Sequence, residues 1–280
     1  MAVENINWYP GHMKKTRELI QENLKMVDLV IEVIDARIPI SSRNPIIDEL
    51  IQGKRRVIAL NKSDLSDDEC NKVWIDRLSN NGRNKVVILN SNRGDGIKEL
   101  LKSLSKIQDE INSQKERKRP LRMMIVGVPN VGKSSLINRL TGKKSAKTGD
   151  KPGVTRGKQW LAIDNGMQLL DTPGILWPKF EDPSVGLNLA FCGSIKDEIL
   201  DISDLCLELI KVLMKDYPEL LMERYKLESL DEDALINMES IASKRGFILS
   251  GKRIDYERTA KTVLDEFRSG AIGKITLEKI

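Results

Sequence analysis

Residues 127–135 read Gly-Val-Pro-Asn-Val-Gly-Lys-Ser-Ser (GVPNVGKSS), which fits the pattern G-x-x-x-x-G-K-[ST]. The apolar run RMMIV at 122–126 leads into this stretch, and the helical pattern SSLINRL at 134–140 leads out of it. A strand, a glycine-rich turn and a helix in this order let backbone N–H groups surround phosphate oxygens at the helix N-terminus. An ordinary glycine-rich turn is disfavoured because both the motif and its setting match. The stretch therefore predicts a phosphate-binding loop.

The chemistry expected of this loop assigns a role to each polar side chain. Lys133 supplies a positive charge to the β- and γ-phosphates, and the Ser134 hydroxyl is placed to ligate Mg²⁺. The residues expected to contact the nucleotide here are Asn130, Val131, Gly132, Lys133, Ser134 and Ser135.

Two segments further along the chain complete the expected phosphate site. DTPG at 171–174 follows another apolar run, so Asp171 can hold Mg²⁺ while the Gly174 N–H reaches the γ-phosphate. On its own this tetrapeptide would be a common turn. Thr155 lies in the Lys- and Gly-rich segment 147–160, where a threonine can close on Mg²⁺ and the γ-phosphate. A mobile polar loop is the other interpretation of that segment, and both can hold.

Base selection is predicted from NKSD at 61–64, which ends an apolar run as N-K-x-D does in guanine-nucleotide proteins. The Asp64 carboxylate can accept hydrogen bonds from guanine N1–H and N2, groups that adenine lacks. A buried acceptor left unpaired by the wrong base gives strong discrimination. Asn61 and Lys62 belong to the same motif, and Asn90 and Ser91 of the next run, NSN at 90–92, can supply further contacts to the base.

Short Val- and Ile-rich runs alternate with helical patterns over the first part of the chain. The runs lie at 27–35, 55–64, 84–92, 122–130 and 167–174, and the helical patterns include 13–26, 68–79 and 97–111. This alternation predicts an α/β fold with a mostly parallel sheet and helices on both faces. Beyond residue 180 no strand-like run recurs, so we expect two domains, 1–180 and an all-α domain at 181–280.

Bulk composition narrows the classes of function. No apolar run approaches the roughly 18 residues that a membrane span needs, so we expect a cytoplasmic protein. The three cysteines have no metal-ligand spacing, and only 4% of residues are aromatic, which disfavours a stacking platform for single-stranded nucleic acid. The net charge of +5 is uneven, because residues 183–280 carry 14 Lys and Arg against 18 Asp and Glu. This asymmetry hints at a nucleic-acid-facing or ribosome-facing surface.

The order of the motifs points to a family. NKSD and NSN precede the phosphate-binding loop, Thr155 and DTPG, whereas ordinary small GTPases have the phosphate-binding loop first. With WYPGHM at 8–13, the chain resembles the circularly permuted GTPases of the YlqF family, ribosome biogenesis GTPase A. The match is specific over residues 8–178 and weaker over 183–280. It implies a GTPase that uses GTP and Mg²⁺, slow alone and stimulated by the ribosomal subunit.

The resemblance also implies how water and charge are handled. Ile175 stands where many GTPases have a water-orienting glutamine, and the family assigns this role to the histidine of its PGH segment, here His12. A capping or surface role is the alternative for this single histidine. Asn130 stands where related GTPases help to coordinate K⁺. The alternative interpretation of Asn130 is structural, as a loop asparagine that tolerates an unusual backbone angle.

For the C-terminal domain the family implies contact with ribosomal RNA late in large-subunit assembly. The expected partners are the precursor of the large (50S) subunit, its 23S rRNA and ribosomal proteins, with no membrane and a monomeric protein. The cations that can bind phosphates are Lys244, Arg245, Lys252, Arg253, Arg258 and Lys261, although a solvated helical face explains them too. The rival function is a non-catalytic, GTP-gated RNA-binding switch. Asp64 disfavours an ATP-using enzyme.

Overall fold

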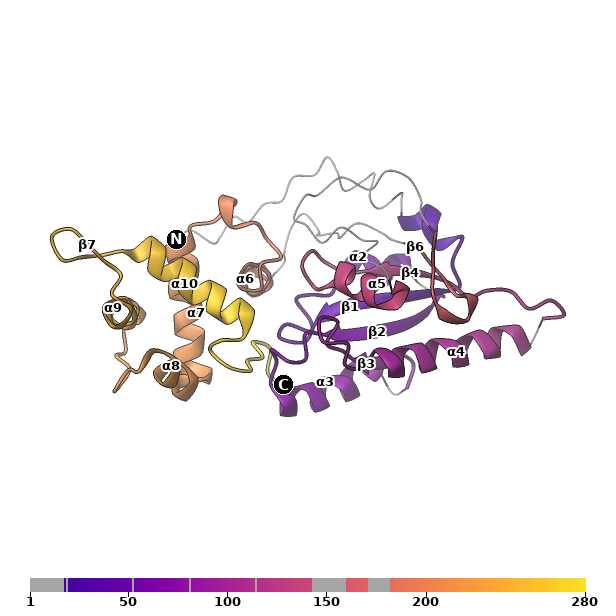
Figure 1. Ribbon diagram of the computed structural model, residues 1–280, viewed down its shortest axis with the longest axis horizontal. Helices are drawn as coiled ribbons and strands as arrows, with labels where there is room; N and C mark the ends of the chain where they lie inside the picture. The colour runs from indigo at the N-terminus through magenta and orange to yellow at the C-terminus, as the bar shows by residue number, and fades with distance from the viewer. Residues whose placement is uncertain are drawn as a thin grey trace. The chain divides into compact units, whose positions relative to one another are not determined.

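The computed structural model describes residues 18, 20–51, 53–80, 82–113, 115–142, 160–170 and 182–280. These residues form two compact units. The first contains the described residues from 18 to 170 together with Glu278–Ile280, and the second contains residues 182–277 (Figure 1). Each unit is described by itself below.

A six-stranded sheet organises the first unit, in the order β3-β2-β1-β4-β6-β5. Every neighbouring pair is parallel except β5 and β6, which are antiparallel. The strands are β1 (Leu29–Asp35), β2 (Arg55–Asn61), β3 (Lys85–Ile88), β4 (Arg122–Val126), β5 (Trp160–Ala162) and β6 (Gln168–Leu170). The mostly parallel sheet and the five predicted apolar runs are confirmed, whereas the short β5 was not predicted.

The strand order brings the motifs together although their order along the chain is permuted. β1, the first strand of the chain, lies between β2 and β4, and β4 leads into the phosphate-binding loop. β1 and β2 are in register along their length, so Asp35 lies opposite Asn61. Because parallel strands end at the same edge of a sheet, the residues after β1, β2, β3 and β4 gather at one edge.

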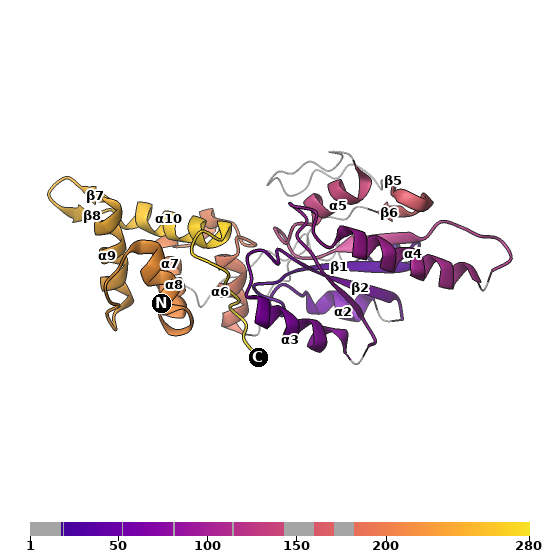
Figure 2. The same cartoon turned by 60° about the horizontal axis from the view of Figure 1, so that its bottom comes forward.

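Helices cover both faces of this sheet. They are α2 (Pro45–Leu50), α3 (Asp68–Ser79), α4 (Ile97–Ser113) and α5 (Lys133–Thr141), and residues 20–24 are helical as well. Trp74 and Leu78 of α3 pack against Ile34, Ile58 and other strand side chains in one buried cluster. Figure 2 shows α3 and α5 on opposite sides of the sheet. This arrangement accounts for strands that are buried along nearly their whole length.

The second unit is built around α7. Its helices are α6 (Pro183–Phe191), α7 (Ile202–Asp216), α8 (Pro218–Tyr225), α9 (Ala234–Arg245) and α10 (Tyr256–Ser269), and α7 contacts all of the others. Aspartates cap the N-termini of four helices, accepting hydrogen bonds from the first-turn N–H groups. These caps are Asp182, Asp201, Asp233 and Asp255. They place part of this unit's negative charge in a structural role.

One element of this unit was not predicted. The two-residue strands β7 (Ile248–Leu249) and β8 (Arg253–Ile254) form a hairpin between α9 and α10, where the sequence analysis expected no strand. A pairing of two residues is too short to produce a periodic pattern. Gly251 and Lys252 in its turn have φ values of 77° and 61°, which explains a glycine at this position. In the part of the chain that the structure covers, no helix combines the length and hydropathy of a membrane span.

Candidate functional site

The phosphate-binding loop joins β4 to α5, as the sequence predicts. Gly127 and Gly132 have φ values of 154° and 97°, in the region that favours glycine. A Cβ atom on Gly127 would lie 2.4 Å from the Val33 carbonyl oxygen, and one on Gly132 would lie 2.3 Å from Asn61 Nδ2. The loop therefore packs too closely against β1 and β2 for any side chain at these two positions. α5 begins directly afterwards at Lys133 and directs its first N–H groups toward the loop.

The Lys133 ammonium lies inside this loop. Its Nζ donates a hydrogen bond of 2.7 Å to the Val128 carbonyl oxygen, and the side chain is buried. A phosphate oxygen is a charged acceptor and forms a stronger hydrogen bond with an ammonium than a neutral carbonyl does. The lysine is therefore already held where an incoming phosphate can take over its hydrogen bond. Ser134 follows on the first turn of the helix, partly exposed.

Asn61 connects three segments of the site. Its Nδ2 donates to the Val131 carbonyl oxygen at 2.7 Å, while its Oδ1 accepts from the Ser91 backbone N–H at 3.0 Å and from the Ser91 hydroxyl at 2.8 Å. The side chain is buried. The sequence analysis expected Asn61 to contact the nucleotide. In the structure its amide holds the phosphate-binding loop and the 90–92 loop against the end of β2, and the contact with the nucleotide stays a prediction.

The segments predicted to contact the base lie next to each other at the ends of β2 and β3. The Ser63 N–H donates to the Leu89 carbonyl oxygen at 3.1 Å, which fixes the NKSD turn beside β3. Asn90 Oδ1 accepts from the backbone N–H groups of Asn92 and Arg93 at 3.1 and 3.0 Å, closing a tight turn. Asp64 is partly buried in the NKSD turn. The predicted residues Asn61, Lys62, Asp64, Asn90 and Ser91 thus share one edge of the sheet with the phosphate-binding loop.

Arg139 on α5 also supports the 90–92 loop, and the sequence analysis did not predict it. Its guanidinium donates to the backbone carbonyl oxygens of Ser91, at 3.1 Å, and of Asn92. The helix that begins at the phosphate-binding loop therefore also positions the loop expected to contact the base. The only sequence signal for this role of Arg139 is its position as a basic residue on the last turn of the helix.

A second set of unpredicted residues surrounds Lys62. Asp35, at the end of β1, is buried and accepts from Arg37 Nε at 3.0 Å and from Arg37 Nη2 at 2.8 Å. The Lys62 ammonium lies 2.8 Å from Asp35 Oδ2. Burial by itself raises the pKa of Asp35, but the charges of Arg37 and Lys62 outweigh it and hold the pKa well below its usual range. The sequence signal for this cluster was the position of an acidic residue, Asp35, at the end of an apolar run.

The backbone of Lys62 is unusual. It has a φ of 61°, in the left-handed region that non-glycine residues rarely adopt. Asn130 in the phosphate-binding loop has a similar φ of 60°, as its structural interpretation expects. His12, Thr155, Asp171 and Gly174 lie outside the described residues.

The six cations of the C-terminal unit that were predicted to bind phosphates differ in their surroundings. Arg245 Nη2 pairs with Glu266 at 2.8 Å, and its guanidinium lies 5.3 Å from the centre of the Tyr225 ring. The guanidinium of Arg258 lies 4.4 Å from the centre of the Phe247 ring. These two arginines therefore contribute to the packing of their own unit. All six cations are exposed, including Lys244, Lys252, Arg253 and Lys261.

Comparisons with known proteins agree with this site. A family model described as a 50S ribosome-binding GTPase matches residues 122–244, and one described as an RsgA GTPase matches residues 46–181. Ribosome biogenesis GTPase A of Bacillus cereus is 48% identical over 277 residues, covering 98% of this chain and 93% of that protein. Mitochondrial ribosome-associated GTPase 1 of Mus musculus is 35% identical, covering 97% and 90% respectively. GNP-bound YlqF from T. maritima matches with a TM-score of 0.68 at 29% identity, covering 95% of this chain and 98% of that chain.

Proposed function

Because the chain belongs to the ribosome biogenesis GTPase A family and is a GTPase involved in ribosome assembly, we propose that it acts on the large (50S) subunit. The proposed step is late in maturation, is cytoplasmic and involves contact with 23S rRNA and ribosomal proteins by a monomer. The matching family description, a 50S ribosome-binding GTPase, supports the choice of subunit.

One observation carries the nucleotide part of this proposal. The buried Asn61 amide bonds to Val131 in the phosphate-binding loop and to Ser91 in the base loop. A single side chain therefore sets the spacing between the segments that would hold the phosphates and the base of one nucleotide. Of the nucleotide-binding residues, Asn61 itself acts by positioning the others.

The described residues fit a bound nucleoside triphosphate. Lys133 exchanges its hydrogen bond with Val128 for one with a phosphate oxygen, and the N–H groups at the start of α5 bind the same group. Mg²⁺, when bound, neutralises charge on the phosphates, and Ser134, Thr155, Asp171 are the side chains proposed to hold it. Val131, Gly132 and Ser135 line the same loop, and the Gly174 N–H is proposed to reach the γ-phosphate. On the base side, the Asp64 carboxylate reads guanine, with Lys62 and Asn90 beside it.

Two further residues are proposed to act on the hydrolysis step. His12 orients the attacking water, since Ile175 at the usual glutamine position has no polar group to do so. Asn130 helps to hold a K⁺ that stabilises charge on the phosphates, and Lys133 and Thr155 are proposed to take part in the same step. The oxygen between the β- and γ-phosphates gains negative charge as its bond to the γ-phosphorus breaks and water attacks from the opposite side, so both roles act on the rate of hydrolysis.

A turnover measurement separates catalysis from binding. GTP hydrolysis by the wild type and by His12→Ala is followed in K⁺ buffer, with and without purified large subunits, while GDP binding is checked in parallel. We expect large subunits to stimulate the wild type and His12→Ala to lose about 100-fold or more of the stimulated rate while still binding. Normal turnover by the variant would exclude His12 from the reaction. Replacement of K⁺ by Na⁺ tests Asn130 in the same assay.

The rival function is a GTP-gated RNA-binding switch in which hydrolysis is incidental. It predicts that His12→Ala releases from the subunit as fast as the wild type does. Under either proposal, the cations proposed to bind phosphates in the helical unit are Lys244, Arg245, Lys252, Arg253, Arg258 and Lys261. Two of them, Arg245 and Arg258, also contact side chains of their own unit.

A further inference from the structure

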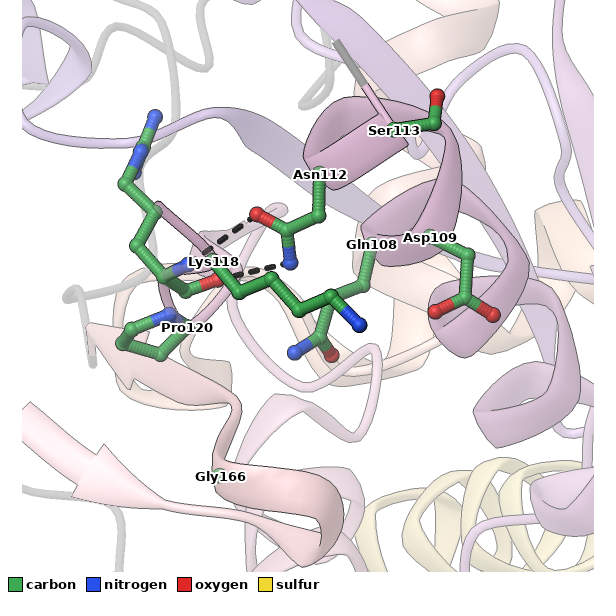
Figure 3. Close-up of a pocket in the computed structure, with 8 residues that line it drawn as sticks. Gln108, Asp109, Asn112, Ser113, Lys118, Pro120 and Gly166 are labelled. Atoms are coloured by element: carbon green, nitrogen blue, oxygen red, sulfur yellow. Dashed lines mark hydrogen bonds between the residues drawn. The ribbon is translucent and has the colours of Figure 1, made fainter. Parts of the chain in front are cut away.

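The connection between α4 and β4 is anchored at its far end by one side chain. Asn112, near the end of α4, accepts a hydrogen bond from the Arg119 backbone N–H and donates one to the Arg119 carbonyl oxygen, each at 3.1 Å (Figure 3). The Lys115 N–H also donates to the Asn112 carbonyl oxygen at 3.2 Å. Residues 115–119, called the basic loop below, are thus fastened to the helix at both ends.

The Arg119 side chain fastens the basic loop a second time. Its guanidinium forms two hydrogen bonds with the Asp28 carboxylate, one of them 2.8 Å long. Burial raises the pKa of Asp28, but the bonds from Arg119 and from the Arg122 N–H outweigh this and lower it overall. Asp28 therefore stays ionised near neutral pH, and Arg119 is engaged in holding the loop.

The remaining cations of the basic loop face outward. Lys115, Arg117 and Lys118 are exposed, and within the described part of the chain Arg117 and Lys118 form no ion pair. Glu116 is the only acidic residue of the loop. A loop held in shape with unpaired cations is suited to a polyanion, because the side chains lose little backbone freedom when they bind.

An open pocket of about 540 Å³ adjoins the basic loop. Gln108, Asp109 and Ser113 line it from α4, and Lys118 and Pro120 line it from the other side of the connection (Figure 3). Its volume lies within the range of small-molecule sites, roughly 300–1,000 Å³. The amide of Gln108, the carboxylate of Asp109 and the hydroxyl of Ser113 can hydrogen-bond the edge of an unstacked base while the neighbouring cations bind its phosphates, and proteins read single-stranded RNA in part through such base-edge hydrogen bonds.

The basic loop is separate from the nucleotide site. It precedes β4, whereas the phosphate-binding loop follows β4, and the five residues of this strand span roughly 15 Å. RNA at the basic loop and a guanine nucleotide at the other edge of the sheet do not compete for the same groups.

We propose that the basic loop and its pocket form a second RNA-binding surface, on the GTPase unit, that takes a single-stranded segment of large-subunit rRNA. The proposal rests on the proposed rRNA contact of this protein and adds a binding surface outside the helical unit. Because this surface lies away from the nucleotide site, it binds RNA equally whether that site holds GDP or a GTP analogue.

The test measures binding of the full chain to a large-subunit rRNA transcript over a range of salt concentrations. We expect Arg117→Gln/Lys118→Gln to raise Kd about 10-fold near 100 mM salt and to reduce the slope of log Kd against log salt by about 1.5. Lys98→Gln/Lys102→Gln, which removes two exposed cations from α4, is the matched control and should leave both values unchanged. Asn112→Ala keeps every charge, so it should raise Kd several-fold with little change in slope. GDP affinity checks that each variant is folded.

The outcomes separate this proposal from the proposed function. If Arg117→Gln/Lys118→Gln binds the transcript as the wild type does while Lys252→Gln/Arg253→Gln binds weakly, the basic loop is not an RNA surface but the protein still contacts rRNA. If the wild type itself shows no salt-dependent binding, the rRNA contact fails altogether. If the basic-loop variant loses binding to polyglutamate but not to RNA, the surface serves an acidic protein and the proposal is overturned.

Discussion

Replacing Asn61 by alanine should weaken nucleotide binding, because it removes the hydrogen bonds that hold two loops of the site together. The change deletes three hydrogen bonds, one to Val131 O and two to Ser91. It leaves a buried N–H group of Ser91 and a buried carbonyl of Val131 without these partners. A buried donor left unpaired costs about 1–3 kcal/mol, and a lost carbonyl partner adds about 1 kcal/mol.

Part of this cost appears as a lower free energy of unfolding of the nucleotide-free protein. The rest appears as weaker nucleotide binding, because the nucleotide must then order both loops without the Asn61 hydrogen bonds. We expect the Kd for GDP to rise about 10- to 100-fold, which corresponds to about 1.4–2.8 kcal/mol. Calorimetric titration with GDP measures the affinity, and urea unfolding measures the stability. Asn44→Ala is the control, because Asn44 is a buried asparagine that caps α2 and should cost about 1 kcal/mol of stability with no change in Kd. A GDP affinity of Asn61→Ala within twofold of the wild type would refute the bridging role.

Three further changes test other parts of the site. Gly132→Ala places a Cβ 2.3 Å from Asn61 Nδ2 at a φ of 97°, so GDP titration should show at least a 100-fold loss of affinity; unchanged affinity would mean that the loop readily shifts. Asp64→Asn should exchange guanine for xanthine preference in competition binding, and retained GTP preference would exclude Asp64 as the base reader. The lowered pKa of Asp35 stabilises the fold above the ordinary carboxyl pKa, near 3.9, and this contribution disappears as pH falls. Urea unfolding should therefore show a smaller loss of stability between pH 5 and pH 3 in Asp35→Asn than in the wild type, and equal losses would contradict the ion pairs.

Local sequence signals were sufficient for the phosphate-binding loop because all of its determinants lie within one strand, one turn and one helix start. Gly127, Gly132 and Lys133 are at fixed spacing, and the apolar run before them has a clear boundary. NKSD and GVPNVGKS were both predicted to bind one nucleotide, which requires them to lie at the same edge of the sheet. That edge is found at the ends of β2 and β4, on either side of β1.

Side-chain partnerships across the fold were not predictable in this way. Asp35 meets Lys62 because the register of β1 and β2 brings their ends together, and only Asp35's place at the end of a strand hinted at it. Arg245 meets Glu266 through the packing of α9 against α10, so its availability for RNA could not be judged from charge alone. The hydrogen bonds of the Asn61 amide to Val131 and Ser91 could not be predicted from the motif, because they depend on how two distant loops pack at the end of β2.

The measurement that tests the central claim most directly is GTP turnover in the presence of purified large or small ribosomal subunits at equal concentration. If this chain is an assembly GTPase of the large subunit, large subunits should raise the turnover rate at least 10-fold over the protein alone, and small subunits should leave it near the unstimulated rate. Equal rates with both subunits, or stimulation by the small subunit alone, would contradict the account.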